Sequence, residues 1–335
     1  MAQATVLVTT RSFGREVSEP MDRLRKAGCT ILEWREGSGL DEADLRTKVA
    51  RADAWIVAFH PIGAVLMDAA PRLRVIAKHG VGVDNIDIRA ATARGILVTT
   101  APSANDQAVA DLTMTLLLSL LRRLPEANAS VKSGRWERFL GDGLTGRVMG
   151  IVGLGRIGQN VACRAKGFGV ELIGADPVWP IEAAQELGIR RVELNDLFTQ
   201  ADIISLHAPL TPDTTGLIDE AAIALMKPRV WIVNTSRGKI VNEKAMYEAL
   251  ASGKVAGYAT DVFEAEPPVG NPLLALPNVV ATPHMGTHTR ESLRLMGDRV
   301  VDAVLRVFNG ERPEFVVNPE VFDRAAASRP NHPNR

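Results

Sequence analysis

Short runs rich in valine and isoleucine alternate with helical stretches along nearly the whole chain. Strands have this composition when helices cover both faces of their sheet. The pattern therefore predicts parallel sheets in an α/β protein. The runs form one group before Pro102 and another after Gly146, with a long helical region at residues 103–136 between them. Two α/β domains are therefore expected. The predicted strands are residues 5–9, 54–58, 74–77, 96–99, 148–152, 171–174, 203–206, 230–233 and 279–281.

The domain boundaries follow from the order of these segments. After residue 286 the chain becomes helical again, and it then reaches an apolar segment at residues 315–317 that can return to the first domain. We expect residues 1–102 together with 287–322 to form one domain and residues 103–286 to form the other. A length of 335 residues suits two domains with separate cores. Residues 323–335 have few large apolar side chains, and we expect a mobile tail there.

Composition and charge exclude several classes of function. Lys+Arg and Asp+Glu are equal at 39 each, which disfavours a nucleic-acid-binding protein. The longest apolar stretch, residues 112–121, is about half of what a bilayer requires, and the amino terminus does not look like a leader peptide. The two cysteines, Cys29 and Cys163, do not have the spacing of metal ligands. We expect a cytoplasmic protein that binds no nucleic acid, membrane or metal.

A glycine-rich turn follows one of the predicted strands and opens a helix. Gly153, Gly155 and Gly158 allow a tight turn, close backbone approach to a pyrophosphate, and close packing of helix on strand. Asp176 follows the next predicted strand, where a carboxylate can accept hydrogen bonds from ribose hydroxyls. It would also repel an additional phosphate, and residues 177–179 contain no cation, so NAD is favoured over NADP. A helix cap or turn residue is the structural alternative for Asp176.

Three ionisable side chains lie in later loops. Arg237 follows the predicted strand at residues 230–233, Glu266 lies in an acidic loop, and His284 follows the strand at residues 279–281. Open α/β sheets bind ligands at the carboxyl ends of their strands, where an arginine suits an anion. Taken singly, these residues could be a surface cation, a solvated carboxylate and a helix-cap histidine. Their joint occurrence after a glycine-rich turn favours a functional site.

Taken together, these motifs resemble the D-2-hydroxyacid dehydrogenase family (D-isomer specific), most closely its phosphoglycerate dehydrogenase-like branch. The resemblance covers nearly the whole chain. It implies two doubly wound parallel sheets: a Rossmann NAD-binding domain and a flavodoxin-like substrate domain built from both chain ends. It also implies a homodimer, which the apolar surplus of residues 104–124 suits. The matching segments are GVGVDNID at residues 80–87, GLGRIG at 153–158, HAPL at 207–210, TTG at 214–216, and those around Arg237, Glu266 and His284.

The resemblance implies a role for each matched residue. Arg237, Glu266 and His284 would be catalytic. Substrate would be bound by Arg237 and by the segment Lys78, His79, Gly80, Val81 and Gly82, with a buried structural role as the alternative for His79. NAD would be bound by Gly153, Gly155, Arg156, Ile157, Gly158, Asp176, Ala208, Pro209, Thr235, Ser236, Asp261 and Gly286.

The chemistry expected of the three catalytic candidates follows from their side chains. Reduction of a 2-oxo acid places negative charge on the carbonyl oxygen as hydride arrives, so a fixed cation and a proton donor should face that oxygen. Arg237 would hold the carboxylate and polarise the carbonyl, and His284 would supply the proton. Glu266, bonded to the other ring nitrogen, would fix the tautomer and favour the protonated ring. These roles predict an NAD-dependent oxidoreductase that acts on the CH–OH group of small 2-hydroxy acids.

The chain departs from the phosphoglycerate dehydrogenase pattern at two places. Those enzymes typically have arginines where this chain has Ala58–Phe59 and Lys78–His79. Because the arginine fork suits a doubly charged phosphate best, an unphosphorylated acid is favoured, with D-3-phosphoglycerate as the alternative. Since the chain ends at residue 335, no additional regulatory domain is expected. A second alternative is a corepressor-like protein that senses NAD without turnover.

Overall fold

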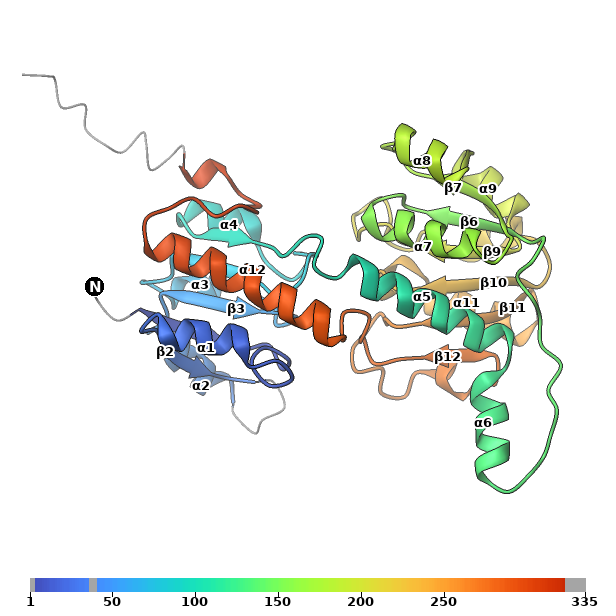
Figure 1. Ribbon diagram of the computed structural model, residues 1–335, viewed down its shortest axis with the longest axis horizontal. Helices are drawn as coiled ribbons and strands as arrows, with labels where there is room; N and C mark the ends of the chain where they lie inside the picture. Colours follow the sequence, from blue (N-terminus) through green and yellow to red (C-terminus); the bar gives the residue numbers. More distant parts are fainter. Residues whose placement is uncertain (1–3, 36–40, 323–335) are drawn as a thin grey trace, which may run out of the picture. The chain divides into compact units, whose positions relative to one another are not determined.

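The computed structural model describes residues 4–35 and 41–322. The chain divides into two compact units, one built from both chain ends (unit 1, through Asn105 and from Thr287 on) and one from Asp106–Gly286 (unit 2). Each unit is an all-parallel sheet with helices on both faces, so the predicted fold class is confirmed (Figure 1). The tail predicted to be mobile lies outside the described residues.

The sheet of unit 1 has the strand order β2-β1-β3-β4-β5, which is the flavodoxin-like order. One face packs against α2, α3 and α4, and the other packs against α1 and α12. Residues 315–317 return to this sheet, as predicted: the amide of Val317 donates to the Val98 carbonyl at 2.8 Å. The elements are β1 Thr5–Val8, α1 Glu19–Lys26, β2 Thr30–Glu33, α2 Glu42–Val49, β3 Ala54–Val57, α3 Ala64–Asp68, β4 Val75–Lys78, α4 Ile88–Ala93, β5 Leu97–Thr99 and α12 Arg290–Phe308.

The sheet of unit 2 has the order β12-β11-β10-β9-β6-β7-β8, a Rossmann order with one additional strand. Helices α5 and α7 cover one face, and α9, α10 and α11 cover the other. The strands are β6 Val148–Val152, β7 Glu171–Ala175, β8 Arg190–Arg191, β9 Ile203–Leu206, β10 Val230–Asn234, β11 Val255–Thr260 and β12 Val279–Ala281. The helices are α5 Asp106–Leu121, α6 Leu124–Lys132, α7 Arg156–Lys166, α8 Ile181–Leu187, α9 Leu194–Gln200, α10 Glu220–Leu225, α11 Glu243–Ala251, and the 3-10 turns η1 Gly238–Ile240 and η2 Pro272–Ala275.

Most predicted strands agree with the observed ones to within one residue, but the long helical region at residues 103–136 is wrong in one respect. It consists of two helices, α5 and α6, separated by Arg123 in a left-handed conformation with φ of 50°. Pro125 lies in the first turn of α6, where a proline is tolerated, whereas the interior of a continuous helix would exclude it. Residues 135–144 have no regular secondary structure. Among the described residues, none of the helices has the length and apolar character needed to cross a membrane.

Candidate active site

The three catalytic candidates follow adjacent strands of unit 2. Arg237 follows β10, Glu266 follows β11 and His284 follows β12. The carboxyl ends of these strands are in register, because Asn234 pairs with Thr260 and Thr260 pairs with Ala281. The sheet therefore carries all three loops at one edge, where open α/β sheets bind their ligands.

His284 and Glu266 form the hydrogen bond that the sequence predicts. The ring Nδ1 lies 2.7 Å from Glu266 Oε2, and Glu266 Oε1 accepts from the backbone amide of Phe263 at 3.1 Å. Burial alone would raise the pKa of Glu266. The hydrogen bond from His284, with the charges of His284 and Arg237, outweighs burial and holds this pKa below its usual range. Since an ionised carboxylate only accepts, Nδ1 carries the proton that joins the pair, and Nε2 is the ring nitrogen that Glu266 does not bind.

His284 lies in a strained turn that Asp261 holds in place. The histidine has φ of 50°, a left-handed conformation that costs a non-glycine residue on the order of 1 kcal/mol. Asp261 is buried. It accepts from the Thr282 hydroxyl at 2.6 Å and from the amides of Met285 and Gly286 at 2.8 and 2.7 Å. These bonds fix the chain on both sides of His284. Asp261, predicted only as a cofactor residue, thus also positions the candidate acid.

Arg237 is held by a buried residue that sequence reasoning missed. Asn234, at the end of β10, accepts from the amide and hydroxyl of Ser236 and donates to the Arg237 carbonyl at 3.0 Å. A Cβ at Gly238 would lie 1.9 Å from the Phe263 carbonyl carbon, so the Arg237 loop touches the backbone of the Glu266 loop. The sequence offered one signal for Asn234, namely its position as a polar residue at the end of an apolar strand.

The glycine-rich turn lies at the topological switch point between β6 and β9. Gly153 has φ of 89°, and a Cβ there would lie 2.7 Å from the Ala208 amide nitrogen. A Cβ at Gly158 would lie 2.1 Å from the Gly153 carbonyl oxygen. Gly155 caps α7, whose first residues are Arg156 and Ile157. A turn that needs glycine at residues 153 and 158, at the amino end of an 11-residue helix, fits the pyrophosphate of a dinucleotide.

Asp176 is also a turn residue. Its two oxygens accept from the amides of Leu154 and Val178 at 2.6 and 2.7 Å, so the structural alternative for Asp176 holds beside the cofactor role. An acceptor with two oxygens retains lone pairs for ribose hydroxyls. Residues 177–179 contain no cation, but the fold brings one close to them. The guanidinium carbon of Arg191, on β8, lies 5.5 Å from the centre of the Trp179 ring.

The other predicted cofactor residues line the same edge of the unit 2 sheet. The Thr113 hydroxyl donates to the Val109 carbonyl, so at the 2.7 Å contact between hydroxyls it is Thr235 that donates to Thr113. Thr235 thus keeps only acceptor capacity for a ligand. Ala208 is buried beside the glycine turn, and the carbonyl of the exposed Pro209 accepts from the Thr214 hydroxyl.

The substrate candidates follow β4 in unit 1. The amide of Gly80 donates to the Lys78 carbonyl at 2.9 Å, so it is already engaged. Within the described part of the chain, the amides of Val81 and Gly82 make no backbone hydrogen bond. These two amides are therefore better placed than the amide of Gly80 to bind a carboxylate.

Lys78 and His79 are both buried. The Lys78 ammonium donates to the Ala58 carbonyl and to Asn85 Oδ1, and it lies 5.8 Å from the ring centre of Phe59. Burial lowers the pKa of His79 to about 4, and its ring packs edge-on against Phe13. A neutral, enclosed His79 favours the structural alternative for this residue.

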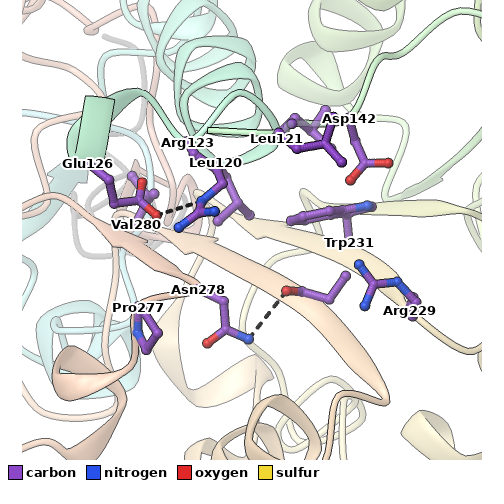
Figure 2. Close-up of a pocket in the computed structure, with 13 residues that line it drawn as sticks. Leu120, Leu121, Arg123, Glu126, Asp142, Arg229, Trp231, Pro277, Asn278 and Val280 are labelled. Carbon is purple, nitrogen blue, oxygen red and sulfur yellow. Dashed lines mark hydrogen bonds and ion pairs between the residues drawn. The ribbon is translucent and has the colours of Figure 1, made fainter. Parts of the chain in front are cut away.

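A separate pocket of about 250 Å³ lies at the amino ends of β10, β11 and β12, away from the catalytic candidates (Figure 2). Trp231 and Leu120 contribute apolar walls, and Asn278 donates to the Ala256 carbonyl at 3.3 Å. Arg229 and the ion pair of Arg123 with Glu126 lie at its border. This pocket is therefore not part of the candidate active site.

Comparison with known proteins gives consistent matches. The family model for the NAD binding domain of D-isomer specific 2-hydroxyacid dehydrogenase matches residues 114–286. A D-3-phosphoglycerate dehydrogenase from Methanocaldococcus jannaschii is 47% identical over 292 residues, which is 86% of this chain and 56% of that protein. A glyoxylate reductase from Thermococcus litoralis is 41% identical over 318 residues, 92% of this chain and 96% of that protein.

Solved structures agree with these matches. D-lactate dehydrogenase from Aquifex aeolicus, complexed with NAD and lactic acid, superposes with a TM-score of 0.81 at 28% identity, covering 96% of this chain and 98% of that one. The chain spans about half the length of the curated phosphoglycerate dehydrogenases it matches.

Proposed function

Because the chain belongs to the D-isomer specific 2-hydroxyacid dehydrogenase family, we propose that it transfers hydride between NAD and a small 2-hydroxy or 2-oxo acid. The observation that carries the proposal is the His284–Glu266 pair at the strand edge that also bears Arg237. A proton donor, a carboxylate that orients it and a fixed cation are what carbonyl reduction requires.

In this mechanism each catalytic residue acts on the substrate oxygen atoms. NADH, when bound, supplies the hydride to the carbonyl carbon. Arg237 holds the substrate carboxylate and draws negative charge onto the carbonyl oxygen, and His284 Nε2 gives its proton to that oxygen. In the oxidative direction Nε2 takes the hydroxyl proton. Glu266 keeps the proton of Nδ1 in place and stabilises the positive ring before transfer.

The proposal assigns unit 2 to the cofactor and unit 1 to substrate selection. The glycine turn, Asp176 and the acceptor Thr235 fit NAD, and the Asp176 carboxylate supports NAD over NADP by repelling a ribose phosphate. Val81 and Gly82 offer amides to the substrate carboxylate. A location in the cytoplasm belongs to the same proposal.

We propose an unphosphorylated acid, such as glyoxylate or hydroxypyruvate, as the substrate. The Lys78 ammonium already donates to two neutral oxygens, those of Ala58 and Asn85, so a phosphate would have to displace internal hydrogen bonds to bind it. A lysine also lacks the planar fork that holds a phosphate bidentately. The similarity to phosphoglycerate dehydrogenases favours D-3-phosphoglycerate as a second candidate.

A kinetic comparison tests this choice. Wild-type protein with NADH should reduce glyoxylate or hydroxypyruvate with a higher kcat/KM than 3-phosphohydroxypyruvate, and His284→Ala serves as the inactive control. A preference of ~10-fold or more for the phosphorylated acid, about 1.4 kcal/mol in the transition state, would reverse the assignment. Binding of NAD without turnover of any 2-oxo acid would instead support the corepressor-like alternative.

We also propose that unit 2 pairs with a second copy of the chain through residues 124–142. Four large apolar side chains are exposed in this short segment: Leu124 at 56%, Val131 at 54%, Trp136 at 80% and Leu140 at 93%. Soluble monomers rarely expose so many in one place. The pocket of Figure 2 adjoins the same segment and offers apolar walls to a partner's side chains.

Light scattering during size-exclusion chromatography tests the pairing. The wild-type protein should elute as a dimer at micromolar concentration, and the double variant Trp136→Ser/Leu140→Ser should elute as a folded monomer. Leu225→Ser removes an exposed leucine on α10 and should leave the dimer intact. A monomeric wild-type protein would refute the pairing.

A further inference from the structure

The amino end of α11 is joined to the loop that carries Glu266. Glu243, the first residue of α11, accepts from the Glu264 amide through Oε1 at 2.9 Å and from Asn271 Nδ2 through Oε2 at 2.7 Å. Glu264 returns the contact, because its Oε1 accepts from the Glu243 amide at 3.0 Å. One side chain therefore holds both ends of the loop, and Glu266 lies between them.

The loop has no buried residue of its own to fix its position. Between Phe263 and Leu273 no residue is buried, and this stretch contains neither a helix nor a strand before η2 begins. Segments with few buried apolar contacts open at low free-energy cost. The position of Glu266 therefore depends on hydrogen bonds, and besides those that Glu266 itself makes, Glu243 accepts one at each end of the loop.

Glu243 lies in the first turn of α11, where a carboxylate favours the helix, but its place beside a second carboxylate also has an electrostatic cost. Its carboxylate is partly buried beside that of Glu264. Burial and this like charge raise the pKa of Glu243, although hydrogen bonds from the Glu264 amide and Asn271 oppose the rise. Among the described residues, no lysine or arginine forms an ion pair with either carboxylate. An arrangement with this electrostatic cost is informative, because costly local arrangements concentrate at functional sites.

We propose that Glu243 is a positioning residue for the acid–base pair, holding the loop so that Glu266 stays within hydrogen-bond distance of His284 Nδ1. Glu243 touches neither the ring nor the reacting atoms. It acts through the backbone of the loop and so sets how much of the time Glu266 supports the ring. The inference rests on the proposed function, since only a catalytic His284 gives this support a purpose.

Titration of the His284 ring by NMR tests the proposal without substrate or cofactor, with the His284 signal assigned by its loss in His284→Gln. Glu266→Gln removes the carboxylate partner and should move the midpoint of the ring titration to lower pH by about half a unit or more. Glu243→Ala should move it in the same direction. Glu248→Ala, which removes an exposed glutamate from the same helix, should leave it unchanged.

A double variant separates positioning from general support of the fold. If Glu243 acts through Glu266, then Glu243→Ala added to Glu266→Gln should cause no further shift of the midpoint and no further loss of kcat. By itself Glu243→Ala should lower kcat ~10-fold and leave KM for the 2-oxo acid within about twofold, because proton transfer and not substrate binding is affected.

Two results would overturn the proposal: an unmoved midpoint in folded Glu243→Ala, or effects that add fully to those of Glu266→Gln. If the alanine variant does not fold, Glu243→Gln replaces it. That variant keeps one acceptor for Glu264 but presents an amide to Asn271, so an intermediate shift is expected, and no shift would overturn the proposal. A wild-type protein that shows the titration effects but reduces no 2-oxo acid would refute the proposed function and leave the positioning role standing.

Discussion

At the scale of single residues, two buried polar side chains, Asn234 and Asp261, hold the backbone around the catalytic candidates. Arg237, Glu266 and His284 follow apolar strands in a recognisable order, so the sequence indicates them directly. Asn234 bonds Ser236 and Arg237, its near neighbours in the sequence, whereas Asp261 bonds residues that are distant from it in the sequence. Sequence spacing predicts which side chains meet along a helix or strand, but it does not predict the partners of a buried polar group in a loop.

The first prediction concerns two members of the trio. His284→Ala and Arg237→Ala should each lower kcat for reduction of the preferred 2-oxo acid by at least ~100-fold, the scale of losing an acid–base group or a charge stabiliser. Stopped-flow or steady-state assays with NADH measure this directly. Thermal denaturation of both variants should match the wild type, because neither side chain belongs to a hydrophobic cluster. Near-normal turnover in either variant would refute its catalytic role.

At the scale of elements, the prediction was most accurate where the strand has a strongly apolar sequence. The runs for β6, β9 and β12 match the observed strands end to end. The strand β11 was missed because its sequence VAGYAT is rich in small residues. The cause is visible in the packing, since a Cβ at Gly257 would lie 2.6 Å from the Trp231 ring. A strand whose side chains are small because an indole from the next strand packs against it does not have a strongly apolar sequence.

The second prediction concerns Asp202, at the amino end of β9. Asp202 precedes β9, accepts from the Val148 amide at 2.8 Å and pairs with Lys227 at 2.9 Å. Burial would raise the pKa of Asp202, but these two partners outweigh burial and lower it from the ordinary 3.8. A carboxylate whose pKa is lowered by folding stabilises the fold fully when the pH is above its ordinary pKa. This contribution is lost as the pH falls through the pKa of the folded state.

Melting temperatures of wild type and Asp202→Asn across the acid range test this linkage. The wild type should be the more stable protein near neutral pH, and the gap should close as the pH falls below about 4. Glu171→Gln, at an exposed ion pair with Arg190, should show a much smaller gap. A gap independent of pH would show that charge plays no part.

At the scale of the whole molecule, each hydrophobic cluster lies within one unit, so each unit has its own core. Each unit also contains a histidine whose surroundings disfavour its charged form. Burial lowers the pKa of His79 in unit 1 to about 4 and that of His207 in unit 2 to about 3. The unfolded chain binds protons at these rings from about pH 6.5 downward, whereas the folded chain resists protonation until far lower pH.

The third prediction is therefore acid sensitivity in both units. Between about pH 7.5 and about pH 5, each buried ring should cost about 2 kcal/mol of the free energy of unfolding. Denaturant titrations at the two pH values measure the loss. His79→Gln should reduce the acid sensitivity of unit 1 only, and His207→Gln that of unit 2 only. Acid sensitivity equal to that of the wild type in both variants would contradict the assignment.

The arrangement of Arg237, Glu266 and His284 on consecutive strand ends of a single unit has an evolutionary consequence. Under the proposed function, mutations at the ends of β3 and β4 would alter which acid is accepted while the strands that precede His284 and Arg237 stay unchanged. Proteins with this architecture could thus diverge in substrate while they keep the same reaction. Directed evolution toward new acid substrates should therefore begin with libraries at Phe59, Lys78 and Val81.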